Sequence, residues 1–184
     1  LEMLAVVAPG EFQLSHPVVG RAIAYLKREQ CPDGSWYGRW GCNYVYGTWQ
    51  VLRGLYKIGE DMTESYVRKA TTWLLSCQND DGGWGEKPDS YDDPQLKGKA
   101  SSTPSQTAWA LMGLLAAGES HSTSARRATE YLIGTQLPDG SWHEDEWTGT
   151  GFPKVFYLKY GLYEHNWPMM ALAQVSRSLR GLKP

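Results

Sequence analysis

The chain has 184 residues, and its 18 Lys and Arg against 20 Asp and Glu give a formal net charge of −2. The length fits a single domain, residues 1–184, that can bury a core. A near-neutral charge without a basic stripe excludes nucleic acid as an expected partner, and no apolar run approaches the roughly 18 residues that a membrane-spanning helix needs.

In chain order, the hydrophobic periodicity predicts six helices. Residues 67–78 show it most clearly, because apolar and small residues recur there at spacings of three and four. The helix over 104–117 also carries its start signals, since Thr103 and Gln106 form a capping box and Pro104 suits the first helical position. The six predicted helices cover residues 17–30, 46–58, 67–78, 104–117, 125–136 and 166–179.

One sequence pattern closes the first helix of each predicted pair. A Leu is followed four residues later by a Gln, and a Trp follows the Gln by six residues, across a turn that contains Asp-Gly. The copies start 48 and 58 residues apart, which indicates one helical hairpin per unit. The three copies are Leu26, Gln30 and Trp36; Leu74, Gln78 and Trp84; and Leu132, Gln136 and Trp142.

The repeat predicts an all-α chain of about three stacked hairpins. Units of this kind cannot each bury their own apolar face, so neighbouring units complete the core by stacking. Three hairpins would form an arc and not a closed ring. We therefore expect a partner segment that is missing from residues 1–184.

The aromatic composition is unusual, with 9 Trp and 11 Tyr against 3 Phe. An ordinary core is filled mainly with Leu, Ile, Val and Phe, because Trp and Tyr carry polar groups that need partners. This bias suggests that the indole and phenol rings have a role beyond packing.

The repeated pattern resembles the Gln–Trp motif of the terpene cyclase family. Residues 33–49 resemble a signature shared by squalene–hopene and oxidosqualene cyclases, residues 102–109 also match, and residues 148–160 resemble the squalene–hopene branch of bacteria. The resemblance covers almost the whole chain. It implies a partial α/α-barrel, or toroid, and it implies that the chain is the C-terminal part of a longer enzyme that cyclises squalene to hopene or hopanol.

The resemblance also implies an aromatic cavity wall. An aromatic face attracts a cation by about 2 kcal/mol when water is excluded, and it has no lone pair that would readily trap a carbocation. Trp40 and Tyr46 are expected near the end of the substrate where the first two rings form, with Tyr46 hydrogen-bonded into the network around the catalytic acid.

The other expected wall residues lie near the C-terminal end of the chain. Phe152 and Phe156 would face the cations that form later in the cascade, and Tyr160 and Tyr163 would line or support the same wall. Without the resemblance, all of these aromatic residues would be interpreted as ordinary core, because aromatic stripes at helical spacing usually pack.

The acid of the family is absent from this sequence. The family carries an Asp-x-Asp-Asp motif, and the nearest similar segment, residues 89–93, has the wrong spacing. We expect the acid and the histidine that assists it upstream of residue 1. The chain alone is therefore expected to be inactive.

Two other functions fit parts of the sequence. A protein prenyltransferase β-subunit has a similar fold but needs a zinc site of Asp, Cys and His, and no convincing set occurs here. Residues 143–146 are charged in the manner of a solvated loop, and Cys31, Cys42 and Cys77 are too few and too widely spaced for a disulfide framework or a metal clip. A non-catalytic toroid that binds hydrophobic ligands is the third possibility.

We expect no cofactor and no metal. From the family we expect four partners: squalene, the N-terminal part of the same enzyme, the cytoplasmic face of a membrane to which the full enzyme binds peripherally, and a second subunit in a homodimer. The isolated chain is expected to be soluble.

Overall fold

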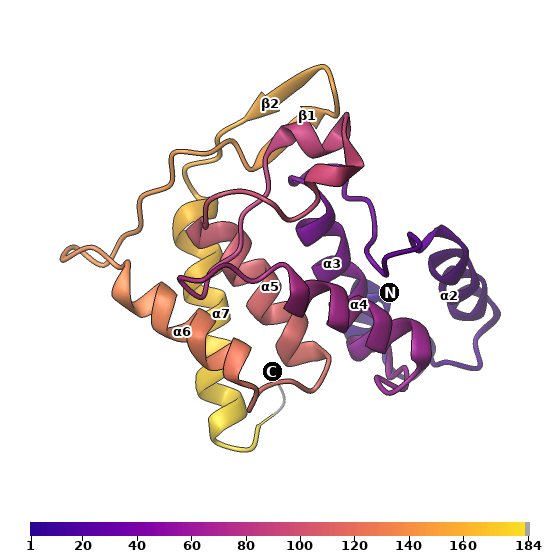
Figure 1. Cartoon of the computed structure of the whole chain (residues 1–184). Helices are drawn as coiled ribbons and strands as arrows, with labels where there is room; N and C mark the ends of the chain where they lie inside the picture. The colour runs from indigo at the N-terminus through magenta and orange to yellow at the C-terminus, as the bar shows by residue number, and fades with distance from the viewer. Residues whose placement is uncertain (183–184) are drawn as a thin grey trace.

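The computed structural model describes residues 1–182 and is mostly helical, as the sequence predicts (Figure 1). Each repeat unit contributes an outer helix followed by an inner helix, in the order that the three hairpins require. The outer helices are α2 (Pro17–Glu29), α4 (Ser65–Ser76) and α6 (Thr123–Gly134), and the inner helices are α3 (Tyr44–Ile58), α5 (Pro104–Ala116) and α7 (Tyr163–Leu179).

All six predicted helices are confirmed, with boundaries shifted by at most a few residues. Capping explains the agreement. The hydroxyl of Thr103 accepts a hydrogen bond from the backbone N–H of Gln106, with Pro104 at the first position of α5, and Gly59 ends α3 in the left-handed conformation with a φ of 87°. The start of α7 lies three residues before the predicted one, because one further turn forms ahead of Pro168.

Helix α5 is the centre of the molecule. All 13 of its residues are buried, because α3 and α7 contact it from two sides and the outer helices α4 and α6 contact it as well. Figure 1 shows α3, α5 and α7 as neighbouring helices, with α2 and α6 toward opposite ends of the arrangement. The hydrophobic core is therefore shared between hairpins, as stacked repeats require.

The Trp of each repeat fixes the turn after its outer helix. The indole N–H groups of Trp36, Trp84 and Trp142 donate to the carbonyl oxygens of Leu26, Leu74 and Leu132, in each case at 2.8 Å. All three rings are buried. The indole therefore satisfies a carbonyl that the end of the helix leaves free while its ring fills the core.

The structure adds short elements that the periodicity did not predict. A β-hairpin joins β1 (Gly149–Phe152) to β2 (Phe156–Leu158), and it lies over the N-terminal ends of the inner helices (Figure 1). Helix α1 (Glu2–Val7) and the 3-10 helices η1 (Pro88–Tyr91) and η2 (Pro94–Leu96) are also present. The alternation of Thr and Gly over residues 148–151 is the period-two signal that could have identified β1.

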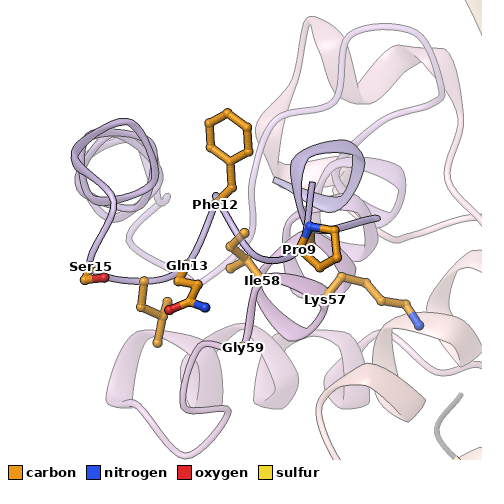
Figure 2. A pocket seen from close by; sticks show the side chains of 9 residues that line it. Pro9, Phe12, Gln13, Ser15, Lys57, Ile58 and Gly59 are labelled. Atoms are coloured by element: carbon orange, nitrogen blue, oxygen red, sulfur yellow. The ribbon is translucent and has the colours of Figure 1, made fainter. Parts of the chain in front are cut away.

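A hollow of about 470 Å³ lies beside the C-terminal end of α3, the opposite end of that helix from Tyr46 (Figure 2). Figure 2 shows the side chains of Ser15, Gln13 and Lys57 spread along this hollow, so its polar groups do not converge on one point. We therefore assign it no function. No helix within residues 1–182 is both long and apolar enough to cross a membrane.

Candidate functional site

The inner helices bring together a group of aromatic rings, which we call the inner ring cluster. The rings of Trp49 and Trp109 are nearly parallel, with centroids 5.9 Å apart and planes at 5°. Trp167 meets Trp49 edge to face at 5.0 Å, so rings from all three inner helices are in contact. The cluster consists of Tyr46 and Trp49 from α3, Trp109 from α5, Tyr163 and Trp167 from α7, and Tyr160 just before α7.

Three of the residues expected from the sequence belong to this cluster. The Tyr46 ring lies 4.9 Å from the ring of Trp109, and the Tyr163 ring lies 5.7 Å from Trp109 and 4.8 Å from Tyr160. The tryptophans Trp49, Trp109 and Trp167 were not selected from the sequence as site residues. Their position in the repeat could have indicated them, since each lies near the start of the second helix of its hairpin.

The other three expected residues form a second group, the hairpin ring group, made of Trp40, Phe152 and Phe156. The centroids of Trp40 and Phe152 are 6.4 Å apart, and those of Phe152 and Phe156 are 5.8 Å apart. Their side chains remain 49%, 53% and 45% exposed, respectively. Residues 1–182 thus leave about half of each of these three residues uncovered.

A row of glycines lies between the two groups of rings. Gly41 and Gly149 are paired in an antiparallel bridge, and Gly151 follows Gly149 by two positions along β1. A Cβ atom at Gly41 would lie 2.4 Å from the Tyr46 ring, and one at Gly149 would lie 2.5 Å from the Tyr160 ring. Because paired residues in a bridge share a face, the rings of Tyr46 and Tyr160 pack on the same bare strip of backbone.

The hairpin ring group approaches the same strip. A Cβ atom at Gly151 would lie 2.0 Å from the Phe156 ring, so only glycine fits the backbone against this ring as it stands. Sequence reasoning missed these glycines as part of the site. The alternation of Gly with Thr over residues 148–151 is the signal that could have indicated them.

Backbone pairing holds Trp40 and the hairpin together. The N–H of Cys42 donates to the carbonyl of Thr148 at 2.8 Å, and the N–H of Thr150 donates to the carbonyl of Trp40 at 3.1 Å. The hydroxyl of Tyr91 donates to the carbonyl of Gly41 at 3.0 Å. Tyr91 is buried, so the aromatic residue of segment 89–93 supports the strand beside Trp40.

Two buried glutamates cap the inner helices at the base of the site. Glu86 Oε2 accepts from the N–H groups of Asn43 and Val45 at 3.2 and 2.9 Å, at the start of α3. Glu144 Oε2 accepts from Ser105 N–H at 3.0 Å, at the start of α5. Each follows the Trp of its repeat by two positions, and this shared spacing could have indicated a common structural role.

The phenols of Tyr46 and Tyr163 are uncharged, whereas the Arg39 guanidinium lies 5.4 Å from the centroid of the Trp40 ring. Burial raises the pKa of Tyr46, and burial raises the pKa of Tyr163 to about 12, so both phenols are neutral at ordinary pH. Burial also raises the pKa values of the Glu86 and Glu144 carboxyls, which favours their uncharged form. Within residues 1–182 no three His, Cys, Asp or Glu side chains are grouped so that they could hold a metal ion.

Aromatic rings arranged in this way can stabilise positive charge. Comparison with known proteins places this arrangement in a family. Residues 1–177 match the family model of the squalene-hopene cyclase C-terminal domain. A crystal structure of a protein from Actinoplanes shares the fold, with a TM-score of 0.62 over 88% of this chain and 52% of that chain at 20% identity.

Curated relatives give the same result. A probable squalene–hopene cyclase of Sinorhizobium fredii is 50% identical over 181 residues, which are 98% of this chain and 28% of that protein. The squalene–hopene cyclase of Alicyclobacillus acidocaldarius is 54% identical over 162 residues, 88% of this chain and 26% of the relative. This chain, which spans 28% and 26% of the length of these two relatives, belongs to the squalene–hopene cyclase C-terminal domain family.

Proposed function

We propose that this chain supplies an aromatic wall of the cavity in which a squalene–hopene cyclase folds and cyclises squalene. The observation that carries the proposal is that the six expected rings form two contacting groups, with Tyr46, Tyr160 and Phe156 packed on glycines of one strip of backbone. Three of these rings, Trp40, Phe152 and Phe156, keep about half of their surface free to meet a substrate.

The proposed chemistry divides between this chain and the rest of the enzyme. A carboxylic acid outside residues 1–182 donates a proton to a terminal alkene of squalene. The electron pairs of successive double bonds then form the new carbon–carbon bonds. The last cation either loses a proton to give hopene, or takes up water and then loses a proton to give hopanol. The rings of this chain stabilise the cations by about 2 kcal/mol where water is excluded.

Neutral phenols suit this role. A phenolate near the path of the cation would attack it and stop the cascade. Because burial raises the pKa of Tyr163 to about 12 and also raises that of Tyr46, both side chains stay uncharged at ordinary pH. The phenols can therefore line the wall without trapping the intermediate.

The test is conversion of squalene by the longer cyclase polypeptide that contains this chain. Phe156→Leu removes a ring that is 45% exposed, and the loss of about 2 kcal/mol would slow turnover roughly 30-fold or release incompletely cyclised products. The matched control is Tyr25→Leu, which removes a ring of similar exposure on α2, outside both ring groups. Unchanged rate and products in Phe156→Leu would contradict the proposal.

The same assay separates the other functions considered. Residues 1–184 alone should convert no squalene, because the acid is expected elsewhere in the polypeptide. A toroid that only binds hydrophobic ligands would retain squalene without converting it, even in the longer polypeptide. Turnover of a prenyl diphosphate that depends on zinc would favour the prenyltransferase alternative.

The chemistry of the substrate also supports a membrane location. Squalene is a hydrocarbon that partitions into lipid, so we propose that the full enzyme binds the cytoplasmic face of a membrane peripherally. From the family resemblance alone, we also propose that it works as a homodimer. Flotation of the full enzyme with phospholipid vesicles, and its mass by light scattering in detergent, test these two points. An enzyme that stays with the soluble fraction as a monomer would contradict them.

A further inference from the structure

Gln106 makes only one half of the capping box that the sequence predicts at the start of α5. The hydroxyl of Thr103 accepts from the backbone N–H of Gln106 at 3.2 Å, as expected. In the other half of such a box, the Gln side chain accepts from the backbone N–H of the capping residue. Here the N–H of Thr103 donates to the carbonyl of Trp84 at 2.9 Å instead. The side-chain amide of Gln106, which is fully buried, therefore serves other partners.

All four hydrogen-bonding positions of this amide are occupied. Its Oε1 accepts from the N–H of Glu86 at 2.9 Å and from the hydroxyl of Thr103 at 3.0 Å. Its Nε2 donates to the carbonyls of Glu86 and Cys42 at 2.7 and 2.9 Å. One buried side chain thus joins the start of α5, the segment that follows Trp84 and the segment that precedes α3.

The segment that precedes α3 links the two groups of rings. Trp40 belongs to the hairpin ring group and Tyr46 to the inner ring cluster, with residues 41–45 between them. Residues 38–43 lie outside the helices and the two strands, and among them Gly41 forms an isolated bridge. The backbone groups of such a segment must find their partners on neighbouring elements. The relative placement of the two ring groups therefore depends on what holds residues 41–45.

Gln106 holds this segment both directly and through Glu86. The carbonyl of Cys42 accepts from Gln106, and the N–H of Cys42 donates to the carbonyl of Thr148 at 2.8 Å, so one path of bonds runs from α5 to the start of the hairpin. The carboxylate of Glu86 accepts from two N–H groups at the start of α3. Because Gln106 bonds to both backbone groups of Glu86, it also fixes the residue that caps α3.

We infer that Gln106 is a positioning residue for the cyclisation, which holds the hairpin ring group and the inner ring cluster in a fixed relative placement. It acts through its bonds to Cys42 and Glu86 and not by contact with the substrate. This inference rests on the proposed function, because the placement affects catalysis only if both ring groups line one cavity. A displacement of about 1 Å in an active site can lower the rate about 100-fold.

The test is Gln106→Leu in the longer cyclase polypeptide, assayed with squalene at a temperature at which the variant remains folded. Leu has a similar size but makes no hydrogen bond, so the backbone groups of Glu86 and Cys42 lose their partner. We expect kcat to fall about 10- to 100-fold while KM changes less than about twofold, since the loss concerns the transition state and not substrate binding. The fraction of incompletely cyclised products should rise at least about fivefold, because the later cations meet displaced rings.

Gln78→Leu is the matched control, because it makes the same substitution at a side chain with the same kind of bonds. The amide of Gln78 donates to the carbonyls of Gly82 and Ser124 at 2.8 and 3.0 Å, outside both ring groups. This variant should also have a lower Tm, but its kcat and product mixture should stay within about twofold of those of the unmodified enzyme. Loss of stability alone therefore cannot account for a change seen only in Gln106→Leu.

A measurement on the unmodified enzyme covers the case in which Gln106→Leu does not fold. The N–H groups of Cys42 and Thr150 should exchange with solvent as slowly as those of the buried helix α5, because the segment and the hairpin are held together. Exchange as fast as that of the exposed residue Asp145 would show that the segment is not fixed, and would overturn the inference.

Two further outcomes would also overturn it. One is a Gln106→Leu enzyme with the rate and products of Gln78→Leu, which would reduce Gln106 to a stabilising residue. The other is a raised KM with unchanged kcat and products, which would indicate a role in binding. Phe156→Leu keeps this failure distinct from failure of the proposed function: if Phe156→Leu alters turnover while Gln106→Leu does not, the function stands and only the inference falls.

Discussion

Replacing Glu86 by Ala and by Gln distinguishes two contributions of a buried carboxyl to stability. One is its acceptance of hydrogen bonds, and the other is its uptake and release of a proton. The side chain is 1% exposed, and its Oε2 accepts from the N–H groups of Asn43 and Val45 at 3.2 and 2.9 Å. The backbone of Glu86 bonds to the side chain of Gln106 in both directions, at 2.9 and 2.7 Å. The side-chain substitutions leave those backbone bonds in place.

The expected loss follows from the two N–H groups. Glu86→Ala leaves both without an acceptor at the buried start of α3, and each unsatisfied group costs about 1–3 kcal/mol. We therefore expect the free energy of unfolding to fall by about 2–6 kcal/mol, with a drop in Tm of about 4–24 °C for a chain of this size. Glu86→Gln keeps an amide oxygen as acceptor and should cost less than about 1 kcal/mol at neutral pH.

The pH dependence gives the second part of the prediction. Burial raises the pKa of Glu86 above its ordinary value of 4.5, although the backbone N–H groups act in the opposite direction. The folded state therefore holds the proton to a higher pH than the unfolded state does. The contribution of this carboxyl to stability is complete below the ordinary pKa and is lost as the pH rises through the folded pKa.

Urea unfolding followed by tryptophan fluorescence, at several pH values from about 4 to 8, measures both effects. Gln has no proton to lose, so the stability of the unmodified protein relative to Glu86→Gln should fall as the pH rises. The reasoning would be refuted if Glu86→Gln were as destabilising as Glu86→Ala, or if the difference between Glu86→Gln and the unmodified protein were independent of pH.

Two further predictions concern the glycine strip and the buried thiol. Gly149→Ala places a Cβ atom 2.5 Å from the Tyr160 ring and should displace that ring. We expect the free energy of unfolding to fall by about 1–3 kcal/mol and the near-ultraviolet circular dichroism spectrum to change. Gly161→Ala is the control, because its Cβ atom meets nothing within 4 Å, and it should have neither effect. Equal effects of the two substitutions would contradict the packing described for Tyr160. Cys42 is fully buried and burial raises its pKa, so iodoacetamide at about pH 8 should modify it only after unfolding, and more slowly than Cys31. Peptide mass spectrometry after timed alkylation measures this, and labelling of Cys42 as fast as Cys31 would show that the strand beside Trp40 opens readily.

The sequence was sufficient to predict the repeat unit, because the contacts that define it are local. Trp84 reaches back ten residues to Leu74, and Gln78 reaches forward four residues to Gly82. A fixed spacing in the sequence therefore corresponds to a fixed geometry in space. The same reasoning identified the six helices, whose periodicity and caps lie within single segments.

The candidate site was harder to predict, because its residues come together over long separations. Gly41 pairs with Gly149, and Cys42 with Thr148, across more than one hundred residues. No local sequence pattern predicts a pairing between residues that are so far apart in the chain. The family resemblance identified the six candidate rings. Only the structure showed that they divide between the inner ring cluster and the hairpin ring group.

The sequence by itself determined the helical hairpins, their turns and the excess of aromatic residues, since propensity, capping and spacing act over a few positions. Only the tertiary structure decided which rings are covered, which glycines admit them, and which turn lacks a neighbouring helix. Gln30, Gln78 and Gln136 occupy identical places in the repeat, yet the first two bond to another helix and the third does not. The physical reason is that burial and partnership depend on what lies next to a residue in space, and a repeat at the edge of an arc has one neighbour fewer.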